Sequence, residues 1–225
     1  MPKVSAPEDI CNLSLDLLKQ SPLVNITTPT MPVEYIFQRW YDTERQAALR
    51  AHPWKFAITR VTLTPNPTTV PAFGYTYAYD LPNDFIRMVS LGDDYLGDMR
   101  MEHVLENGQI LTPSGSTEAF PNVAGVDVKT LFLRYVYDCV DLTKFDSLFV
   151  KYFALQMAVD LSTKFGISAA LGTRLEGEFE KIDTMAKSVN GQDAPIKRIQ
   201  QSKILTKRRG LPGGIFASKY TIFDS

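Results

Sequence analysis

The sequence predicts an α+β protein made of a four-helix bundle, a small antiparallel β-domain inserted into that bundle, and an extended C-terminal arm. Apolar residues recur with helical spacing in the first part of the chain and again in the third. The stretch between them alternates apolar and polar residues and is interrupted by turn residues. The last stretch shows neither period. We therefore expect a bundle of residues 1–53 plus 143–191, a β-domain of 54–142, and an arm of 192–225.

Two helices are expected in the N-terminal part of the bundle. The first begins at Ser5-Ala6-Pro7-Glu8, which fits a capping box in which Ser5 and Glu8 satisfy each other's backbone donors. The second runs from about Pro32 to His52 and ends at Pro53, which cannot continue a helix. The expected apolar positions are Ile10, Leu13, Leu17 and Leu18 in the first helix, and Val33, Phe37, Trp40, Ala47, Ala48 and Ala51 in the second. The expected solvated positions of the second helix are Asp42, Glu44, Arg45 and Arg50.

Short strands are expected through the middle of the chain. Segments 56–63, 75–79, 85–91 and 131–137 are rich in β-branched and aromatic residues and are separated by Pro- and Gly-bearing stretches. A hairpin is expected where Asn107-Gly108 separates two apolar pieces, because Asn-Gly favours the tight turn that joins antiparallel strands.

Two further helices are expected after residue 143. Segment 145–165 is apolar almost all round, which predicts the central, buried helix of the bundle. Thr143 and Asp146 are expected to cap its start, and Gly166 to end it. Segment 168–189 is amphipathic. Its expected apolar face comprises Leu171, Leu175, Phe179, Ile182, Ala186 and Val189.

Composition excludes several classes of function. The 225 residues carry 24 Lys and Arg against 25 Asp and Glu, so the net charge of −1 does not indicate a nucleic-acid binder. Cys11 and Cys139 cannot form a disulfide framework and are expected to be small apolar filler. No apolar run approaches the roughly 18 residues of a membrane span, and the N-terminus lacks the apolar stretch of a secretory signal. We expect a soluble protein made inside the cell, with no membrane partner.

No motif for catalysis, a cofactor or a metal stands out. The dinucleotide-binding glycine pattern, the phosphate-binding loop and the His-Glu-x-x-His zinc motif are all absent from the sequence. His103 is expected to be an ordinary histidine, and Asp93-Asp94 a solvated pair in a loop. We therefore expect no enzyme activity, no cofactor and no metal site. The alternative is a small enzyme with an unrecognised site, which a pocket with converging polar groups would favour.

A corner is expected where the second helix gives way to the first strand. Pro53 stops the helix, and Trp54 and Phe56 follow at once. A tryptophan buries a large apolar area, so Trp54 is expected to anchor the corner in the core. We define the corner as His52, Pro53, Trp54 and Phe56 and assign it a structural role.

The arm carries most of the charge asymmetry of the chain. Residues 197–225 sum to +6, which leaves −7 for residues 1–196. Apolar residues are interleaved with the positive charges, which favours an arm that orders on a partner over a purely solvating tail. The candidate binding residues are Lys197, Arg198, Lys203, Ile204, Lys207, Arg208, Arg209, Ile215, Phe216, Tyr220 and Phe223. The partner is an acidic protein surface or, as the alternative, nucleic-acid phosphates.

Several segments resemble one known family, the head-to-tail adaptors of short-tailed bacteriophages (tail tubular protein A). The most specific is Leu49-Arg50-Ala51-His52-Pro53-Trp54-Lys55-Phe56-Ala57, which is similar to the family's L-R-x-H-P-W-x-F-A. The segment from Gly74 to Arg87 is similar to Y-x-Y-x-L-P-x-D-x-x-R, and the segment from Trp40 to Arg50 also matches. The resemblance spans about residues 8–190. The opening helix, from Ile10 to Leu15, also resembles that of the family, but Lys19-Gln20-Ser21 stands in place of the glycine that often follows it.

The resemblance implies a structural virion protein and no chemistry. It implies a ring of twelve copies in the neck of the phage tail, assembled in the host cytoplasm, which joins the portal protein to the tail nozzle protein. The helical part would face the portal and the β-region the nozzle. Genomic DNA would pass through the lumen, and the ring would help to retain it. We expect the arm to bind the portal or a neighbouring subunit.

Overall fold

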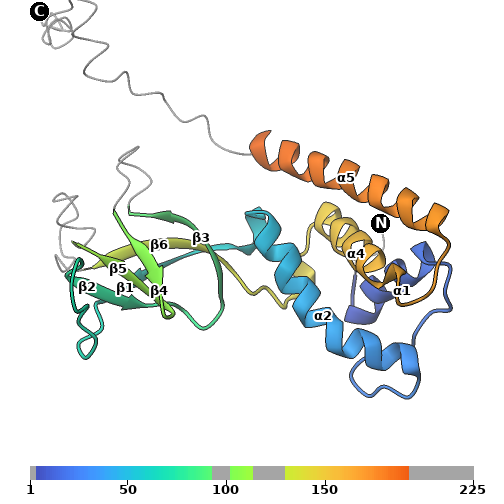
Figure 1. Ribbon diagram of the computed structural model, residues 1–225, viewed down its shortest axis with the longest axis horizontal. Helices are drawn as coiled ribbons and strands as arrows, with labels where there is room; N and C mark the ends of the chain where they lie inside the picture. Colours follow the sequence, from blue (N-terminus) through green and yellow to red (C-terminus); the bar gives the residue numbers. More distant parts are fainter. Residues whose placement is uncertain (1–3, 93–101, 114–129, 193–225) are drawn as a thin grey trace, which may run out of the picture. The chain divides into compact units, whose positions relative to one another are not determined.

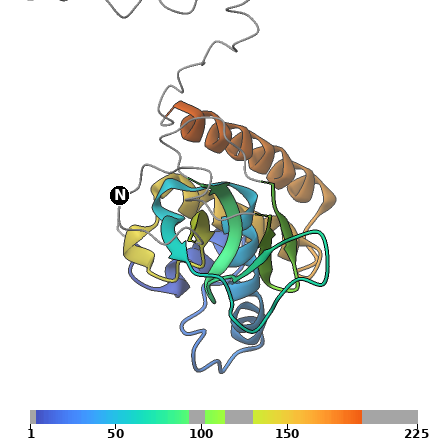
Figure 2. The same cartoon turned by 90° about the vertical axis from the view of Figure 1, so that its left-hand side faces the viewer.

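A computed structural model of the chain describes residues 4–92, 102–113 and 130–192 (Figure 1; Figure 2). The chain divides into two units, Met1–Ala194 and Pro195–Ser225, and the second unit lies outside the described residues. The described part is mixed α/β and has four α-helices and two small antiparallel sheets, which agrees with the expected α+β class. The helices are α1 (Pro7–Leu17), α2 (Pro32–Ala51), α4 (Ser147–Ser162) and α5 (Ala169–Gln192). The strands are β1 (Ile58–Leu63), β2 (Tyr77–Asp80), β3 (Phe85–Leu91), β4 (Val104–Glu106), β5 (Gln109–Thr112) and β6 (Leu131–Tyr137).

The strands form two sheets with the orders β1-β6-β3 and β2-β5-β4. The expected strands 85–91 and 131–137 are confirmed to the residue as β3 and β6. The expected hairpin is also confirmed, because β4 pairs with β5 through a turn in which Asn107 and Gly108 have φ angles of 48° and 72°. The sheets share an apolar cluster of their own, formed by Tyr79, Ile110, Leu131, Leu133 and Tyr135.

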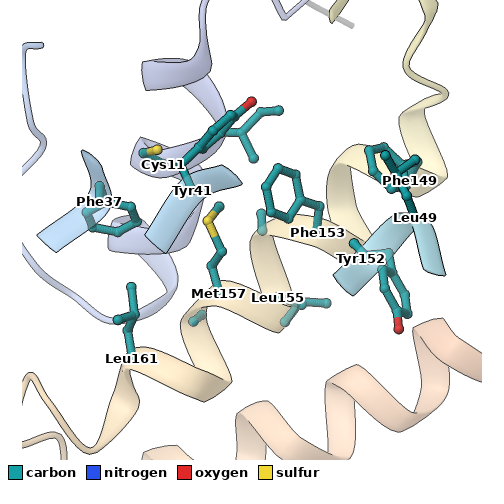
Figure 3. Close-up of a cluster of buried hydrophobic side chains, with 14 of the residues drawn as sticks. Cys11, Phe37, Tyr41, Leu49, Phe149, Tyr152, Phe153, Leu155, Met157 and Leu161 are labelled. Carbon is teal, nitrogen blue, oxygen red and sulfur yellow. The ribbon is translucent and has the colours of Figure 1, made fainter. Parts of the chain in front are cut away.

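The helices pack around α4, which contacts α1, α2 and α5. The prediction of a central, buried helix is confirmed. Its buried residues are Phe149, Tyr152, Phe153, Ala154, Leu155, Met157, Ala158 and Leu161. Figure 3 shows Phe153 and Met157 of α4 next to Tyr41 of α2, and the Tyr41 and Phe153 ring centroids are 5.3 Å apart. The two cysteines are buried and unpaired with each other, as expected of filler.

The start of α1 differs from the expected capping box. Ala6 occupies the N-cap, and the Asp9 carboxylate accepts hydrogen bonds from the backbone N–H groups of Ser5 (2.8 Å) and Ala6 (3.0 Å). Glu8 instead reaches the loop and accepts from Ile26 N at 3.1 Å. Of the expected apolar positions, Ile10 and Leu18 are buried and Leu17 is partly buried, but Leu13 is 43 % exposed. Cys11, Ser14 and Leu15, which were not expected on this face, are also buried.

The bounds of α2 agree with the prediction, but the prediction of which residues form its buried face is partly wrong. Ala47 and Ala51 are exposed, whereas Glu44 and Arg45 are buried. Arg45 donates to the Asp138 carboxylate from Nε and Nη2, each at 3.1 Å, and pairs with Asp42 from Nη1. The burial of these charges is tolerated because partners distant in the chain satisfy them.

Glu44 is satisfied by a residue of α4. Its carboxylate accepts from Gln156 Nε2 at 2.8 Å, and burial raises the pKa of its carboxyl above the ordinary range. The helical face of α2 that faces α4 is therefore mixed in polarity. A pattern based on apolar spacing alone places that face incorrectly.

Two capped turns set the start of α4. Asp146 is its N-cap and accepts from Leu148 N at 3.3 Å, as expected. Thr143 lies earlier, in a short 3-10 helix (Leu142–Lys144) that Asp141 caps. Gly166 follows the end of α4 with a φ of 61°, the left-handed conformation expected of a helix-terminating glycine. Among the helices that the structure describes, none is long and apolar enough to cross a bilayer.

Candidate functional site

The corner connects the end of α2 to β1. Ala51 is the last residue of α2, and His52 has extended backbone angles (φ −133°, ψ 148°). Pro53 follows, and Lys55–Ala57 form a 3-10 turn that leads into β1. The chain direction changes here because Pro53 cannot donate the next helical hydrogen bond.

Trp54 is the anchor of the corner, as predicted. It is 2 % exposed, and its Nε1 donates to the backbone oxygen of Ala48 at 2.9 Å. Its ring centroid lies 5.1 Å from that of Phe149 and 5.5 Å from that of Tyr152, both in edge-on geometry. The ring centroid of Phe56 lies 6.3 Å from that of Trp54, in tilted geometry, and 5.0 Å from that of Phe149. Aromatic pairs in this geometry contribute about 0.5–1.5 kcal/mol beyond their buried area, so the corner binds α4 tightly.

His52 joins the corner to α5. The side chain is nearly buried, and Nε2 lies 2.9 Å from Asp183 Oδ1. An ionised carboxylate only accepts, so His52 is the donor in this hydrogen bond. Lys187 Nζ lies 2.6 Å from the other Asp183 oxygen. Burial acts to raise the pKa of the Asp183 carboxyl, but the hydrogen bonds from Lys187 and His52 outweigh it and hold that pKa below its usual range.

Two arginines hold the end of α2 against β3. Arg87 of β3 donates from Nη1 to the backbone oxygen of Arg50 at 3.1 Å. Arg50 donates from its own Nη1 to the backbone oxygen of Ile86 at 2.7 Å. The last carbonyls of a helix lack helical partners, so Arg87 acts as a C-terminal cap supplied by the sheet.

A pocket of about 250 Å³ opens beside the corner. We call it the corner pocket. Its lining residues are Trp54, Lys55, Phe56, Asp146, Leu148, Ala186 and Val189. They come from the corner, the start of α4 and the later part of α5. The Asp146 carboxylate is already engaged as the cap of α4. Apart from Lys55, the other lining residues are apolar.

The chemistry of the corner pocket suits an apolar side chain. Pockets that hold drug-sized ligands measure roughly 300–1,000 Å³, so a pocket of about 250 Å³ fits something smaller. Its lining residues do not place a nucleophile beside a general base. Within the described ranges, no group of three or more His, Cys, Asp or Glu side chains is arranged to hold a metal ion.

The corner was predictable from the sequence, but its hydrogen-bond partners were not. Asp183 and Lys187 lie outside the expected apolar face of segment 168–189, and no sequence spacing connects them to His52. One signal was available: a histidine next to a buried tryptophan needs a hydrogen-bond partner once it leaves water. Of the other predicted residues, His103 lies just before β4 and is half-buried.

The predicted binding residues of the arm lie outside the described residues, as does Asp93-Asp94. The arm residues in question are Lys197, Arg198, Lys203, Ile204, Lys207, Arg208, Arg209, Ile215, Phe216, Tyr220 and Phe223. Their binding role stays a prediction.

No protein-family model matches the chain, and no curated protein matches it.

Proposed function

We propose that this chain is a structural virion protein, a head-to-tail adaptor that joins a phage portal to the tail nozzle. In this proposal twelve copies form a ring in the neck of the virion, and genomic DNA passes through its lumen. Each copy consists of a four-helix bundle with an inserted β-domain, and an extended arm that binds the portal or a neighbouring subunit. The protein assembles in the host cytoplasm and works without a cofactor.

The observation that carries the proposal is the corner. The segment that resembles the family's L-R-x-H-P-W-x-F-A motif is also the segment that fixes the helices to the first sheet. Trp54 is 2 % exposed and packs on α4, while Arg50 bonds to the backbone beside Arg87. A rigid joint of this kind suits a protein whose two regions contact different neighbours in an assembly.

Electron microscopy of negatively stained mixtures with the portal protein tests the proposal. We expect twelve-fold rings stacked beneath portal rings. A chain that ends at residue 192 should remain folded, because the described elements end there, but should lose stable attachment to the portal. Monomers that never associate with the portal would contradict the adaptor function. Unchanged attachment of the shortened chain would contradict the role of the arm alone.

The second candidate is a nucleic-acid-binding protein that uses the basic arm. The +6 charge of residues 197–225 is the observation that favours it. It predicts DNA binding without the portal, with an affinity that falls by about one log unit per log unit of salt for each phosphate contacted. Titration of a labelled duplex at several salt concentrations separates the two candidates.

A further inference from the structure

The loop between β1 and β2 presents an exposed apolar tip. The tip consists of Val70, Pro71, Ala72 and Phe73, and the side chains of Val70 and Phe73 are 74 % and 89 % exposed. Phe73 is the most exposed of the large apolar side chains that the structure describes. The loop projects away from the strands in both views (Figure 1; Figure 2). No charged residue occurs from Thr64 to Tyr79, so burying the tip against a partner would not remove any charge of this segment from water.

The base of this loop is tied in place. Asn66 Oδ1 accepts from Thr68 N at 2.9 Å and from Thr69 N at 3.1 Å. The Asn66 side-chain amide donates to Asp80 at 2.8 Å, and its backbone N–H donates to Ala78 O at 2.7 Å. Gly74, with φ 80°, turns the chain directly after Phe73. The tip is therefore held ready for binding, which lowers the entropy lost when it is buried.

We propose that the tip of one copy inserts Phe73 into the corner pocket of a second copy of this chain. The tip is apolar and uncharged, and the pocket is an apolar recess of about 250 Å³, a size suited to one large side chain. Phe73 is 89 % exposed in its own chain, so the chain's own tip does not fill its pocket. The lining residues Lys55 and Asp146 carry opposite charges, and a neutral side chain such as that of Phe73 meets no charge repulsion from either of them.

A contact between two different patches is heterologous. Repeated from copy to copy, it closes into a ring when the rotation between copies allows closure. This inference rests on the proposed adaptor function only for the expectation that copies associate. It names the residues through which they would do so.

Cross-linking between two differently tagged chains tests the contact directly. One chain carries Phe73→Cys and the other Val189→Cys, a residue that lines the pocket. The native Cys11 and Cys139 are buried and do not compete, because reactivity needs an accessible thiolate. Oxidation of the mixture should give a disulfide-linked heterodimer. Val140→Cys in place of Phe73→Cys is the matched control, because Val140 is 66 % exposed but lies outside the tip and the pocket lining.

Sedimentation equilibrium gives the second measurement. Phe73→Ser should weaken association by about thirtyfold or more, the loss expected on removing an anchor side chain from an interface. Val189→Trp, which fills the pocket mouth from a partly exposed position, should weaken it as well, and Val140→Ser should not. Circular dichroism confirms that each variant is folded.

The outcomes separate the possible occupants of the pocket. Equal cross-linking of the Phe73→Cys and Val140→Cys chains, or none, would overturn the inference. It would also be overturned if Phe216→Cys in the arm cross-linked to Val189→Cys while Phe73→Cys did not. No portal is present in these experiments. A specific cross-link combined with failure to bind the portal would uphold the contact and refute the adaptor function. Portal binding without a specific cross-link would uphold the adaptor function and refute the contact.

Discussion

His52 Nε2 lies 2.9 Å from Asp183 Oδ1, in a hydrogen bond between residues 131 positions apart in the chain. The bond joins the end of α2 to α5. Helix α4 packs against both helices, and its Tyr152 ring lies 5.5 Å from the ring of Trp54. Because His52 directly precedes Pro53, this contact adds to the packing of Trp54 in fixing the corner relative to the last helix. Its energy is open to measurement.

Replacing Asp183 should destabilise the protein in a pH-dependent way. We expect Asp183→Ala to lower the free energy of unfolding at pH 7 by about 1–3 kcal/mol, because it leaves the buried His52 donor without a partner. The folded-state pKa of Asp183 is lowered from 3.8, so its contribution is present above that pH and is lost as the pH falls through the lowered value. Urea unfolding of variant and wild type should therefore converge in acid. Lys187→Ala is the control, and its loss should be smaller because the Lys187 side chain is 62 % exposed. A difference that stayed constant into acid would contradict this explanation.

Trp54 should be the most costly residue of the corner to truncate. We expect Trp54→Ala to lower the free energy of unfolding by about 3–5 kcal/mol, since a fully buried ring leaves a cavity that the surroundings fill only in part. Trp54→Phe keeps most of the packing but loses the hydrogen bond to Ala48 O, at a cost of about 1 kcal/mol for that bond. Trp40→Ala, at a partly buried position, is the matched control and should cost less. Equal losses for Trp54 and Trp40 would show that the corner is not a special anchor.

The two carboxylates that pair with Arg45 should differ in importance. The Arg45 side chain is 7 % exposed, Asp138 is 21 % exposed and Asp42 is 73 % exposed. Asp138→Ala leaves a nearly buried guanidinium short of a partner and should cost about 3 kcal/mol. Asp42→Ala removes an exposed partner and should cost at most about 1 kcal/mol. Chemical denaturation of both variants at pH 7 compares them, and similar costs would mean that burial does not govern this pair.

Glu34 should control the loop between α1 and α2. Its carboxylate accepts from the backbone N–H groups of Val24 (3.1 Å), Asn25 (3.2 Å), Thr30 (2.7 Å) and Met31 (3.0 Å). The hydrogen bonds from Thr30 and Met31, followed by those from Asn25 and Val24, lower the pKa of Glu34 to about 2. Because the folded pKa is depressed, this stabilisation is present above the ordinary value of 4.5 and is lost as the pH falls toward 2.

Amide hydrogen exchange measures this effect. Glu34→Gln should speed exchange at these four amides, because a neutral amide group has one acceptor oxygen in place of two charged ones. Glu176→Gln, on the exposed side of α5, should leave them unchanged. Unaltered exchange in the Glu34 variant would mean that other contacts hold the loop.

Features that depend on neighbouring residues were predictable from the sequence. The start of α2 at Pro32 and its end before Pro53, the Asn107-Gly108 turn, and strands β3 and β6 all follow from local backbone preferences. The burial of Trp54 was also predictable, because a tryptophan ring directly after the end of a helix removes a large apolar area from water when it packs in the core.

Only the tertiary structure decided which distant groups meet. The spacing of apolar residues assigned Glu44 and Arg45 to solvent, yet both are buried because Gln156 and Asp138 satisfy them from other parts of the chain. The pairing of β6 with both β1 and β3, the hydrogen bond from His52 to Asp183, and the corner pocket beside them likewise arise from packing. The physical reason is the same in each case. Local propensity acts over a few residues, whereas the cost of burying a charge or an apolar face is determined by whatever lies across from it in the folded chain.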